Sequence, residues 1–271
     1  MTRESDPYLL CYRREEQERL VRQAEELAAD SSRLFDEIGV GEGWRAVEVG
    51  CGPLGCLELL SKRVGPRGHV VGIERSDEEV ERARAIARER GLVNVEVRCC
   101  DARETGLAPG SFDLATARLV LVNVPRPEEI VREMVRLVRP GGVVALHEAD
   151  SSGNRLDPPL AAFSRLLELL ARYAAQNGID RDIAPRVPRL LREAGVGDLH
   201  VSPFVHLHPP GHSRRFLFAE FVANTRSRLI ESGLIAADEL DTLASELRKH
   251  LEDPETLALS SLYVRVWGRK R

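Results

Sequence analysis

Short apolar runs alternate with longer amphipathic stretches between residues 44 and 150. The runs have the length and β-branched content of buried strands, and the stretches between them repeat apolar side chains at helical spacing. The pattern predicts strands at 46–50, 69–74, 95–99, 112–118 and 143–148, and helices at 57–63, 78–89 and 128–138. This alternation is typical of an α/β fold with a parallel, doubly wound sheet.

The flanking regions are expected to be mainly helical. Residues 13–38 read as one or two helices, because apolar side chains recur at helical spacing among many charges. Beyond residue 150 the pattern predicts a polar loop, helices at 160–176 and 187–194, a strand at 199–207, two helices within 213–251 and a last strand at 258–267. We expect these extra helices to be insertions rather than a second core.

A glycine turn follows the first predicted strand in the sequence AVEVGCGPLG. Gly50, Gly52 and Gly55 let the backbone turn sharply and approach a ligand without Cβ clashes, and the acid Glu48 precedes them. This layout suits a nucleoside. The same spacing also fits the dinucleotide fingerprint, because Glu74 lies at the distance of its acidic residue. The glycines alone leave the cofactor open.

Composition narrows the choice of partners. The 271 residues carry 39 Lys and Arg against 43 Asp and Glu, so there is no basic excess to bind nucleic acid. We expect a cytoplasmic protein, because neither a signal peptide nor an apolar stretch of membrane-spanning length is visible. The five cysteines are an odd number without metal-ligand spacing, which argues against a disulfide framework and a structural metal.

Five blocks, in order, resemble the class I S-adenosylmethionine (SAM) dependent methyltransferases. They are EVGCGPLG at 48–55, VVGIE at 70–74, VRCCDA at 97–102, SFDLATARLVLVNV at 111–124 and LVRPGGVVALHEAD at 137–150. The opening residues and helical tail are similar to bacterial small-molecule enzymes of natural-product and quinone pathways. The resemblance implies a Rossmann-like seven-stranded sheet whose last strand is antiparallel. It also implies a helical cap at 1–43, a SAM-binding core at 44–150, and acceptor or lid helices with the last two strands at 151–271.

Ligands of open parallel sheets bind at the carboxyl ends of the strands. In this family, the loop after the first strand, here Gly50, Cys51 and Gly52, passes the methionine part of SAM, with Glu48 placed to assist its ammonium group. The alternative role for Glu48 is to cap a helix. Tyr8 is expected, by the resemblance, to reach over the cofactor.

The loops after the next strands supply the other cofactor contacts. Glu74 is predicted to accept hydrogen bonds from both ribose hydroxyls. The neighbouring Arg75 is expected to lie against adenine, with a solvated surface position as the alternative. By resemblance, Asp101 and Ala102 clamp adenine, and the alternative for Asp101 is a turn-forming role. Arg118 and Leu119, also by resemblance, face the methionine end.

Methyl transfer is an in-line displacement that needs a base only when the acceptor must lose a proton. The candidate bases are His147, His206 and His208, at or beyond the ends of strands five and six. His147 leads, because Glu148 and Asp150 follow it and are expected to orient or polarise the ring. A structural histidine is the alternative. His206 and His208 are expected to share one strand face with Phe204.

We therefore expect a SAM-dependent methyltransferase of specialised metabolism, releasing S-adenosylhomocysteine (SAH) and methylating oxygen, nitrogen, sulfur or carbon of a small organic acceptor. Aromatic residues in helices 160–177 and 213–232 suit an apolar acceptor, although core packing or a homodimer interface explains them equally. One alternative is a protein of the same fold that binds SAM without methylating, as a cyclase or accessory subunit. A more remote one is an NAD-dependent oxidoreductase.

Overall fold

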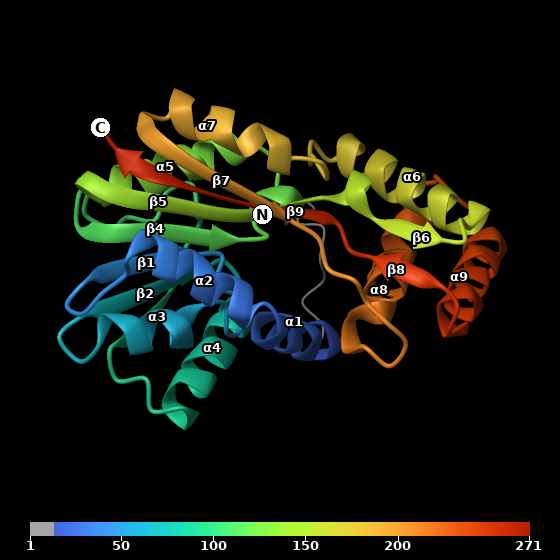
Figure 1. Ribbon diagram of the computed structural model, residues 1–271, viewed down its shortest axis with the longest axis horizontal. Helices are drawn as coiled ribbons and strands as arrows, with labels where there is room; N and C mark the ends of the chain where they lie inside the picture. Colours follow the sequence, from blue (N-terminus) through green and yellow to red (C-terminus); the bar gives the residue numbers. More distant parts are fainter. Residues whose placement is uncertain (1–13) are drawn as a thin grey trace, which may run out of the picture.

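The computed structural model describes residues 14–271, which contain one seven-stranded sheet (Figure 1). Its strand order is β3-β2-β1-β4-β5-β9-β7. The strands are β1 Arg45–Val49, β2 His69–Glu74, β3 Val95–Cys99, β4 Phe112–Arg118, β5 Val138–Asp150, β7 Val196–Phe204 and β9 Leu262–Lys270. β9 pairs antiparallel with both β5 and β7, and the pairings among β1 to β5 are parallel. The predicted Rossmann-like sheet with an antiparallel last strand is confirmed.

Helices cover both faces of the sheet (Figure 1). One face carries α2 Ala28–Ile38, α3 Leu57–Val64 and α4 Asp77–Glu89, and the other carries α5 Pro127–Leu137 and α7 Val187–Glu193. Val47 and Val71 belong to the hydrophobic cluster of the α5 face, whereas Ala46 and Val70 belong to that of the α3 face. Successive strand residues thus enter opposite layers, which is why most residues of the central strands are apolar.

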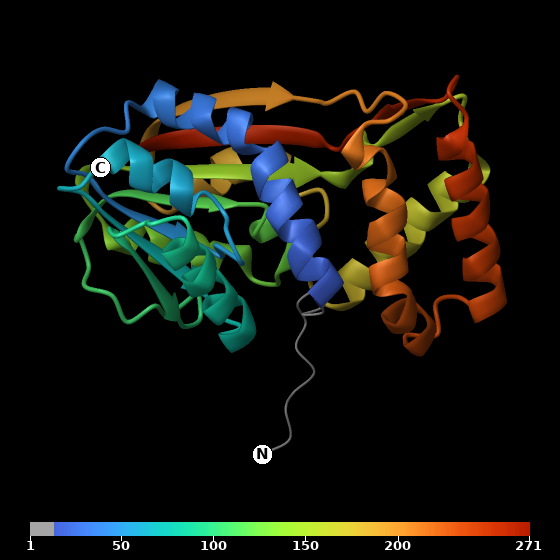
Figure 2. The ribbon, with the colours of Figure 1, turned by 90° about the horizontal axis from the view of Figure 1, so that it is seen from below.

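A helical region stands opposite the carboxyl ends of the parallel strands, as Figure 2 shows, and α1 Arg14–Glu26 lies between it and the sheet. It comprises α6 Ala161–Gln176, α8 Leu217–Glu231, α9 Ala237–Glu252 and a small sheet of β6 Arg155–Asp157 and β8 Leu257–Leu259. Its apolar side chains form a separate buried cluster that includes Phe163, Leu166 and Leu247. The expectation that these insertions lack a second core is therefore wrong.

Several predicted boundaries were also wrong. The strand expected at 199–207 is β7, which begins and ends three residues earlier. The last strand is divided into β8 and β9, because β8 leaves the main sheet to pair with β6, a strand inside the region expected to be a polar loop. β5 begins at Val138 and includes Pro140, Gly141 and Gly142, with a register shift where it pairs with β4. Short 3₁₀ helices are η1 Leu121–Asn123, η2 Ser151–Gly153, η3 Ala184–Arg186 and η4 Ser213–Phe216.

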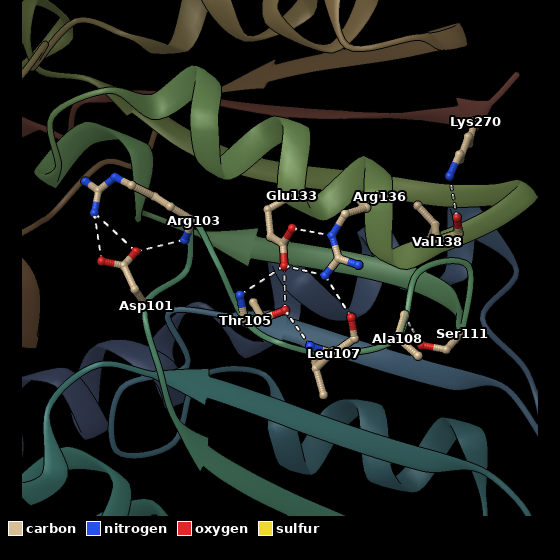
Figure 3. A network of polar contacts seen from close by, with 10 residues as sticks. All are labelled: Asp101, Arg103, Thr105, Leu107, Ala108, Ser111, Glu133, Arg136, Val138 and Lys270. Atoms are coloured by element: carbon tan, nitrogen blue, oxygen red, sulfur yellow. Dashed lines mark hydrogen bonds and ion pairs between the residues drawn. The ribbon is translucent and has the colours of Figure 1, made fainter.

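The buried carboxylate of Glu133, on α5, holds the loop that follows β3 against this helix (Figure 3). Glu133 accepts hydrogen bonds from the backbone N–H of Thr105 at 3.0 Å and from its hydroxyl at 2.5 Å. Arg136 donates to both carboxylate oxygens of Glu133 and to the carbonyl oxygen of Leu107. Although burial raises the pKa of Glu133, the hydrogen bonds from Arg136 and Thr105 outweigh it and lower the pKa below 4.5.

Replacing Glu133 with glutamine is expected to reduce the free energy of unfolding by about 1–2 kcal/mol at pH 7, because a charge-assisted network becomes a neutral one. The folded-state pKa is the lower one, so this stabilisation is present above the unfolded pKa and is lost as the pH falls through the folded pKa. Urea unfolding of both proteins at pH 7 and pH 4 measures it. Glu81→Gln, which breaks an exposed pair with Arg84, is the control. A Glu133→Gln deficit that is equal at both pH values contradicts the prediction.

Candidate functional site

A cavity of about 240 Å³ lies at the carboxyl ends of β1, β2 and β4, between the sheet, α1 and the helical region. Every predicted cofactor residue within the described part of the chain lines it. These residues are Glu48, Gly50, Cys51, Gly52, Glu74, Arg75, Asp101, Ala102, Arg118 and Leu119. Tyr8 lies outside the described residues. The fold thus brings ten residues, which lie between positions 48 and 119 of the sequence, to one cavity.

Each of the three positions in the turn requires glycine, but for different physical reasons. All three have positive φ, at +68° for Gly50, +53° for Gly52 and +51° for Gly55. A Cβ on Gly50 would lie 2.6 Å from Cγ2 of Val120, and one on Gly55 would lie 2.6 Å from Oε2 of Glu48. A Cβ on Gly52 would meet nothing within 4 Å, because this glycine borders the cavity. Two glycines therefore serve packing, and Gly52 leaves space for a ligand.

Glu48 is buried behind the turn, where it acts on the backbone. Its oxygens lie 2.8 and 2.7 Å from the amide nitrogen of Cys56, which donates to them at the start of α3. Burial raises the pKa of Glu48 to about 7, against the lowering effects of Arg118 and of the Cys56 N–H. The capping contact weighed as its alternative is thus present. Arg118 braces the same loop by donating to the carbonyl oxygen of Gly55 at 3.0 Å.

Glu74, at the end of β2, binds backbone N–H groups with both oxygens. Oε2 accepts from Gly52 at 3.1 Å, and Oε1 accepts from Arg75 at 2.6 Å and from Ser76 at 3.2 Å. The carboxylate therefore holds the glycine turn at a fixed distance from the second strand while bordering the cavity.

Asp101 stabilises a local turn, which was the alternative to its predicted contact with adenine. Its Oδ1 accepts from the Arg103 amide at 2.8 Å, and the Arg103 guanidinium bridges this carboxylate to the carbonyl oxygen of Pro125 (Figure 3 shows the carboxylate contacts). The Asp101 side chain remains 42% exposed, so a ligand has access to it. Arg103 was not predicted as a lining residue, and only its place two residues after Asp101 hinted at it.

The turn after β4 is held by Glu148, and this corrects the role expected for that residue. Glu148 is fully buried and accepts from the backbone N–H groups of Val120, Leu121 and Val122 at 2.9–3.2 Å. Burial raises its pKa to about 7, although these N–H groups oppose the rise. Asp150 accepts from Ser152. Neither acid orients His147, because adjacent strand residues point to opposite faces and Asp150 is used by its own turn.

The turn also presents a strained residue to the cavity. Leu119 has φ of +56°, its N–H donates to the carbonyl oxygen of His147 at 2.8 Å, and its own carbonyl accepts from Nδ2 of Asn123 at 2.8 Å. The left-handed conformation costs a branched residue about 1–3 kcal/mol. Glu148 and Asn123 therefore hold a backbone shape that the chain would not adopt alone.

The three candidate histidines have different environments. His147 is 2% exposed, lies beside the Phe204 and Tyr263 rings, and does not border the cavity. Nε2 of His206 lies 3.0 Å from Oδ2 of Asp30 on α2, and His206 also lies outside the lining. The expectation that Phe204, His206 and His208 share one strand face is wrong, because β7 ends at Phe204, although their rings contact one another in sequence. His208 is the one of the three histidines that borders the cavity.

His208 is 5% exposed, and its Nε2 has no hydrogen-bond partner within the described residues. Burial, followed by Arg214 and neighbouring histidines, lowers its pKa to about 3. His208 is therefore neutral near pH 7, which suits it to form a hydrogen bond with a ligand more than to hold a proton.

Replacing His147 with phenylalanine is expected to flatten the pH dependence of stability between pH 7 and pH 5. Burial, followed by Arg118 and Arg265, lowers the pKa of His147 well below 6.5, so only the unfolded chain gains a proton there. The protein then loses up to about 1.4 kcal/mol per pH unit below pH 6.5, and the variant lacks this contribution. Urea unfolding of both proteins at several pH values measures how steeply the free energy of unfolding changes with pH. Equal slopes for the two proteins would show that the folded protein also protonates His147.

Five arginines of the lining were not predicted from the sequence. They are Arg19, Arg103, Arg181, Arg214 and Arg215. They come from four segments, since Arg214 and Arg215 are adjacent in η4, and an arginine in a charged stretch normally indicates a solvated surface. Within residues 14–271, no three His, Cys, Asp or Glu side chains converge as a metal site, and no helix has the length and apolarity to cross a membrane.

Comparison with known proteins agrees with this geometry. A family described as "Methyltransferase domain" matches residues 41–181, just over half of the chain. Nocamycin O-methyltransferase of Saccharothrix syringae is 37% identical over 114 residues, covering 42% of this chain and 41% of that protein. Demethylmenaquinone methyltransferase of Staphylococcus aureus is 32% identical over 143 residues, covering 52% and 55%. The chain spans about half the length of such relatives.

The fold also matches solved structures. The YcgJ protein of Bacillus subtilis superposes with a TM-score of 0.58 at 15% identity, covering 90% of this chain and 100% of that one. At this identity the likeness concerns the fold alone. It extends beyond the segment matched by the family and includes most of the chain.

Proposed function

Because the chain belongs to the methyltransferase domain family, we propose that it transfers a methyl group from SAM to a small organic acceptor. One observation carries the proposal: ten residues predicted to contact the cofactor line a single cavity. The open space over Gly52 and the accessible carboxylates of Glu74 and Asp101 at its border fit a nucleoside with an amino-acid tail.

Distinct segments would hold the parts of the cofactor. The turn of Gly50, Cys51 and Gly52 would receive the methionine portion, Glu74 the ribose hydroxyls, and Asp101 with Ala102 the adenine. Leu119, which follows β4, has a backbone carbonyl oxygen that accepts from Asn123 and has a second lone pair for the ammonium group of the cofactor. Bound SAM supplies an electrophilic methyl group on a sulfonium sulfur.

The protein's own contribution is to orient the acceptor and to exclude water. The helical region provides an apolar wall that includes Phe163, Phe218 and Phe221. His208 orients the acceptor through Nε2, which has no other hydrogen-bond partner among the described residues. Similarity to the nocamycin enzyme supports a place in specialised metabolism.

Calorimetric titration with SAM, SAH and NADH in parallel tests the proposal. We expect micromolar binding of both adenosyl compounds and no binding of NADH. Binding of NADH alone would make the glycine turn a dinucleotide site and overturn the proposal. Binding of SAM with no methyl transfer to any acceptor in a broad screen would instead favour a cyclase or accessory subunit.

A further inference from the structure

Charge is divided unevenly around the cavity. Its carboxylates, Glu48, Glu74 and Asp101, all come from the ends of the first three strands. Beyond residue 102 the charged side chains of the lining are arginines, with no Asp or Glu among the described residues. The charged side chains that residues 181–215 contribute to the lining are therefore cationic, although the whole chain has a formal net charge of -4.

Three of these arginines are used by the fold. Arg215 donates to the carbonyl oxygens of four residues: His208, Leu251, Asp253 and Thr256. Arg118 donates to Ser31 and Gly55, and Arg103 binds Asp101 and Pro125. Their positive charges contribute to the field in the cavity, but their donors are largely committed.

Arg181 differs, because the acids nearest to it in sequence bind other groups. It lies between α6 and η3, where Asp180 pairs with Arg186 and Asp182 accepts from the Ser152 amide. The Arg181 guanidinium donates to Oδ1 of Asn123 at 2.8 Å and lies 4.8 Å from the centroid of the Phe221 ring. Among residues 17–271, whose side chains the structure describes, no carboxylate forms an ion pair with it.

The environment of Arg181 favours an anion. Burial lowers the pKa of Arg181 to about 10, although Asp182, Tyr263 and Glu148 oppose the fall, so the guanidinium stays protonated near pH 7 in a site that disfavours its charge. A partly desolvated cation that faces a cavity gains most from a charge-assisted hydrogen bond with an incoming anion.

Arg214 is a second buried arginine of the same lining. It is 4% exposed, and it donates to the hydroxyl group of Tyr263 at 2.6 Å. Its Nε lies 3.4 Å from Oε2 of Glu26, so its charge is partly balanced. Tyr263 also acts electrostatically on Arg181, and all three side chains line the cavity.

We propose that the acceptor carries an anionic group, a carboxylate or a phosphate, which Arg181 and Arg214 bind while its apolar body lies against Phe163, Phe218 and Phe221. The substrate class is thus a small amphiphilic anion, and this inference rests on the proposed methyl transfer. Arg181 is thus a binding residue for the acceptor. Its hydrogen bond to Asn123, which in turn donates to Leu119, places the anion next to the predicted methionine end of the cofactor.

The test uses the full chain saturated with SAH and matched pairs of probes. The pairs are 4-hydroxybenzoate with 4-hydroxybenzamide, octanoate with octanamide, and phenyl phosphate with phenol. Calorimetry is expected to show at least one anion binding about tenfold or more tightly than its neutral partner. Arg181→Gln is expected to abolish this preference and leave SAH binding unchanged. The matched control is Arg172→Gln, an exposed position on α6 outside the lining, which is expected to retain it.

Arg181→Lys is a second variant in case Arg181→Gln fails to fold. Circular dichroism checks the folding of both variants. Lysine keeps the charge without the planar fork, so a weakened but persistent preference for the anion supports the inference. The inference is overturned if no anion in the panel outbinds its neutral partner, or if Arg181→Gln leaves the preference intact.

Two further outcomes separate the inference from the proposed function. If Arg181→Gln weakens SAM and SAH binding tenfold, the guanidinium binds the cofactor's own carboxylate. The methyltransferase proposal then stands and the acceptor inference falls. If the unaltered protein binds neither SAM nor SAH, the proposed function fails and the inference falls with it.

Discussion

Alanine at position 74 is expected to weaken SAM and SAH binding at least about tenfold, or about 1.4 kcal/mol. A carboxylate at the end of β2 can accept from two ribose hydroxyls, and an alanine provides neither acceptor. The loss has a second component, because Glu74 also accepts from the Gly52 amide and helps to hold the glycine turn. Calorimetric titration of Glu74→Ala with SAH measures the sum.

Glu74→Gln separates the two components. It keeps an oxygen acceptor for the turn but loses the negative charge, so we expect intermediate affinity. The control is Glu78→Ala, an exposed acid in α4 that does not line the cavity. Unchanged SAH affinity in Glu74→Ala would overturn the site assignment. Asp101→Ala is expected to weaken binding to a similar extent through loss of the adenine contact.

Replacing Gly55 with alanine is expected to destabilise the folded protein by about 2–4 kcal/mol. The left-handed backbone alone costs an alanine about 1–2 kcal/mol. The new Cβ would also lie 2.6 Å from Glu48 and 2.7 Å from the Cys51 carbonyl oxygen, in a place where both partners are buried. Relief of this clash requires Glu48 to leave the Cys56 amide. Urea unfolding without ligand measures the effect.

Two other glycines provide controls for Gly55→Ala. Gly91 has φ of +66° and open space around its missing Cβ, so Gly91→Ala isolates the backbone cost and is expected to lose about 1 kcal/mol. Gly52→Ala should be equally mild for stability, yet its methyl group enters the cavity and should reduce SAH affinity. Equal stability of the Gly55 and Gly91 variants would show that Glu48 moves freely.

The carboxyl-end positions illustrate what local sequence encodes. A strand followed by a glycine turn and an acid is a contiguous signal, and parallel topology places all such ends at one edge. The ten positions proposed from these strand ends and from the family resemblance all line the cavity. The sequence did not predict whether Glu48 and Asp101 bind a ligand directly. Their contacts with Cys56 and Arg103 depend on local geometry that the sequence pattern leaves open.

The histidines show the opposite case. His147 and His208 both follow the alternating pattern of a strand end, yet one is enclosed by aromatic rings and the other borders the cavity. The difference arises from β9, which inserts between β5 and β7 and brings Tyr263 beside His147. Insertion of a strand from the end of the chain is a long-range event that no local window records.

Hydrophobic periodicity thus determined the α/β class and the strand sequence of the core, and the glycine turn marked residues that line the cavity, because these features depend on neighbours along the chain. Tertiary structure alone decided the second hydrophobic cluster, the division of the last strand and the position of Arg181 beside Asn123. These features join segments more than 50 residues apart. Their energies come from burial and hydrogen bonding, which exist only once the segments have met.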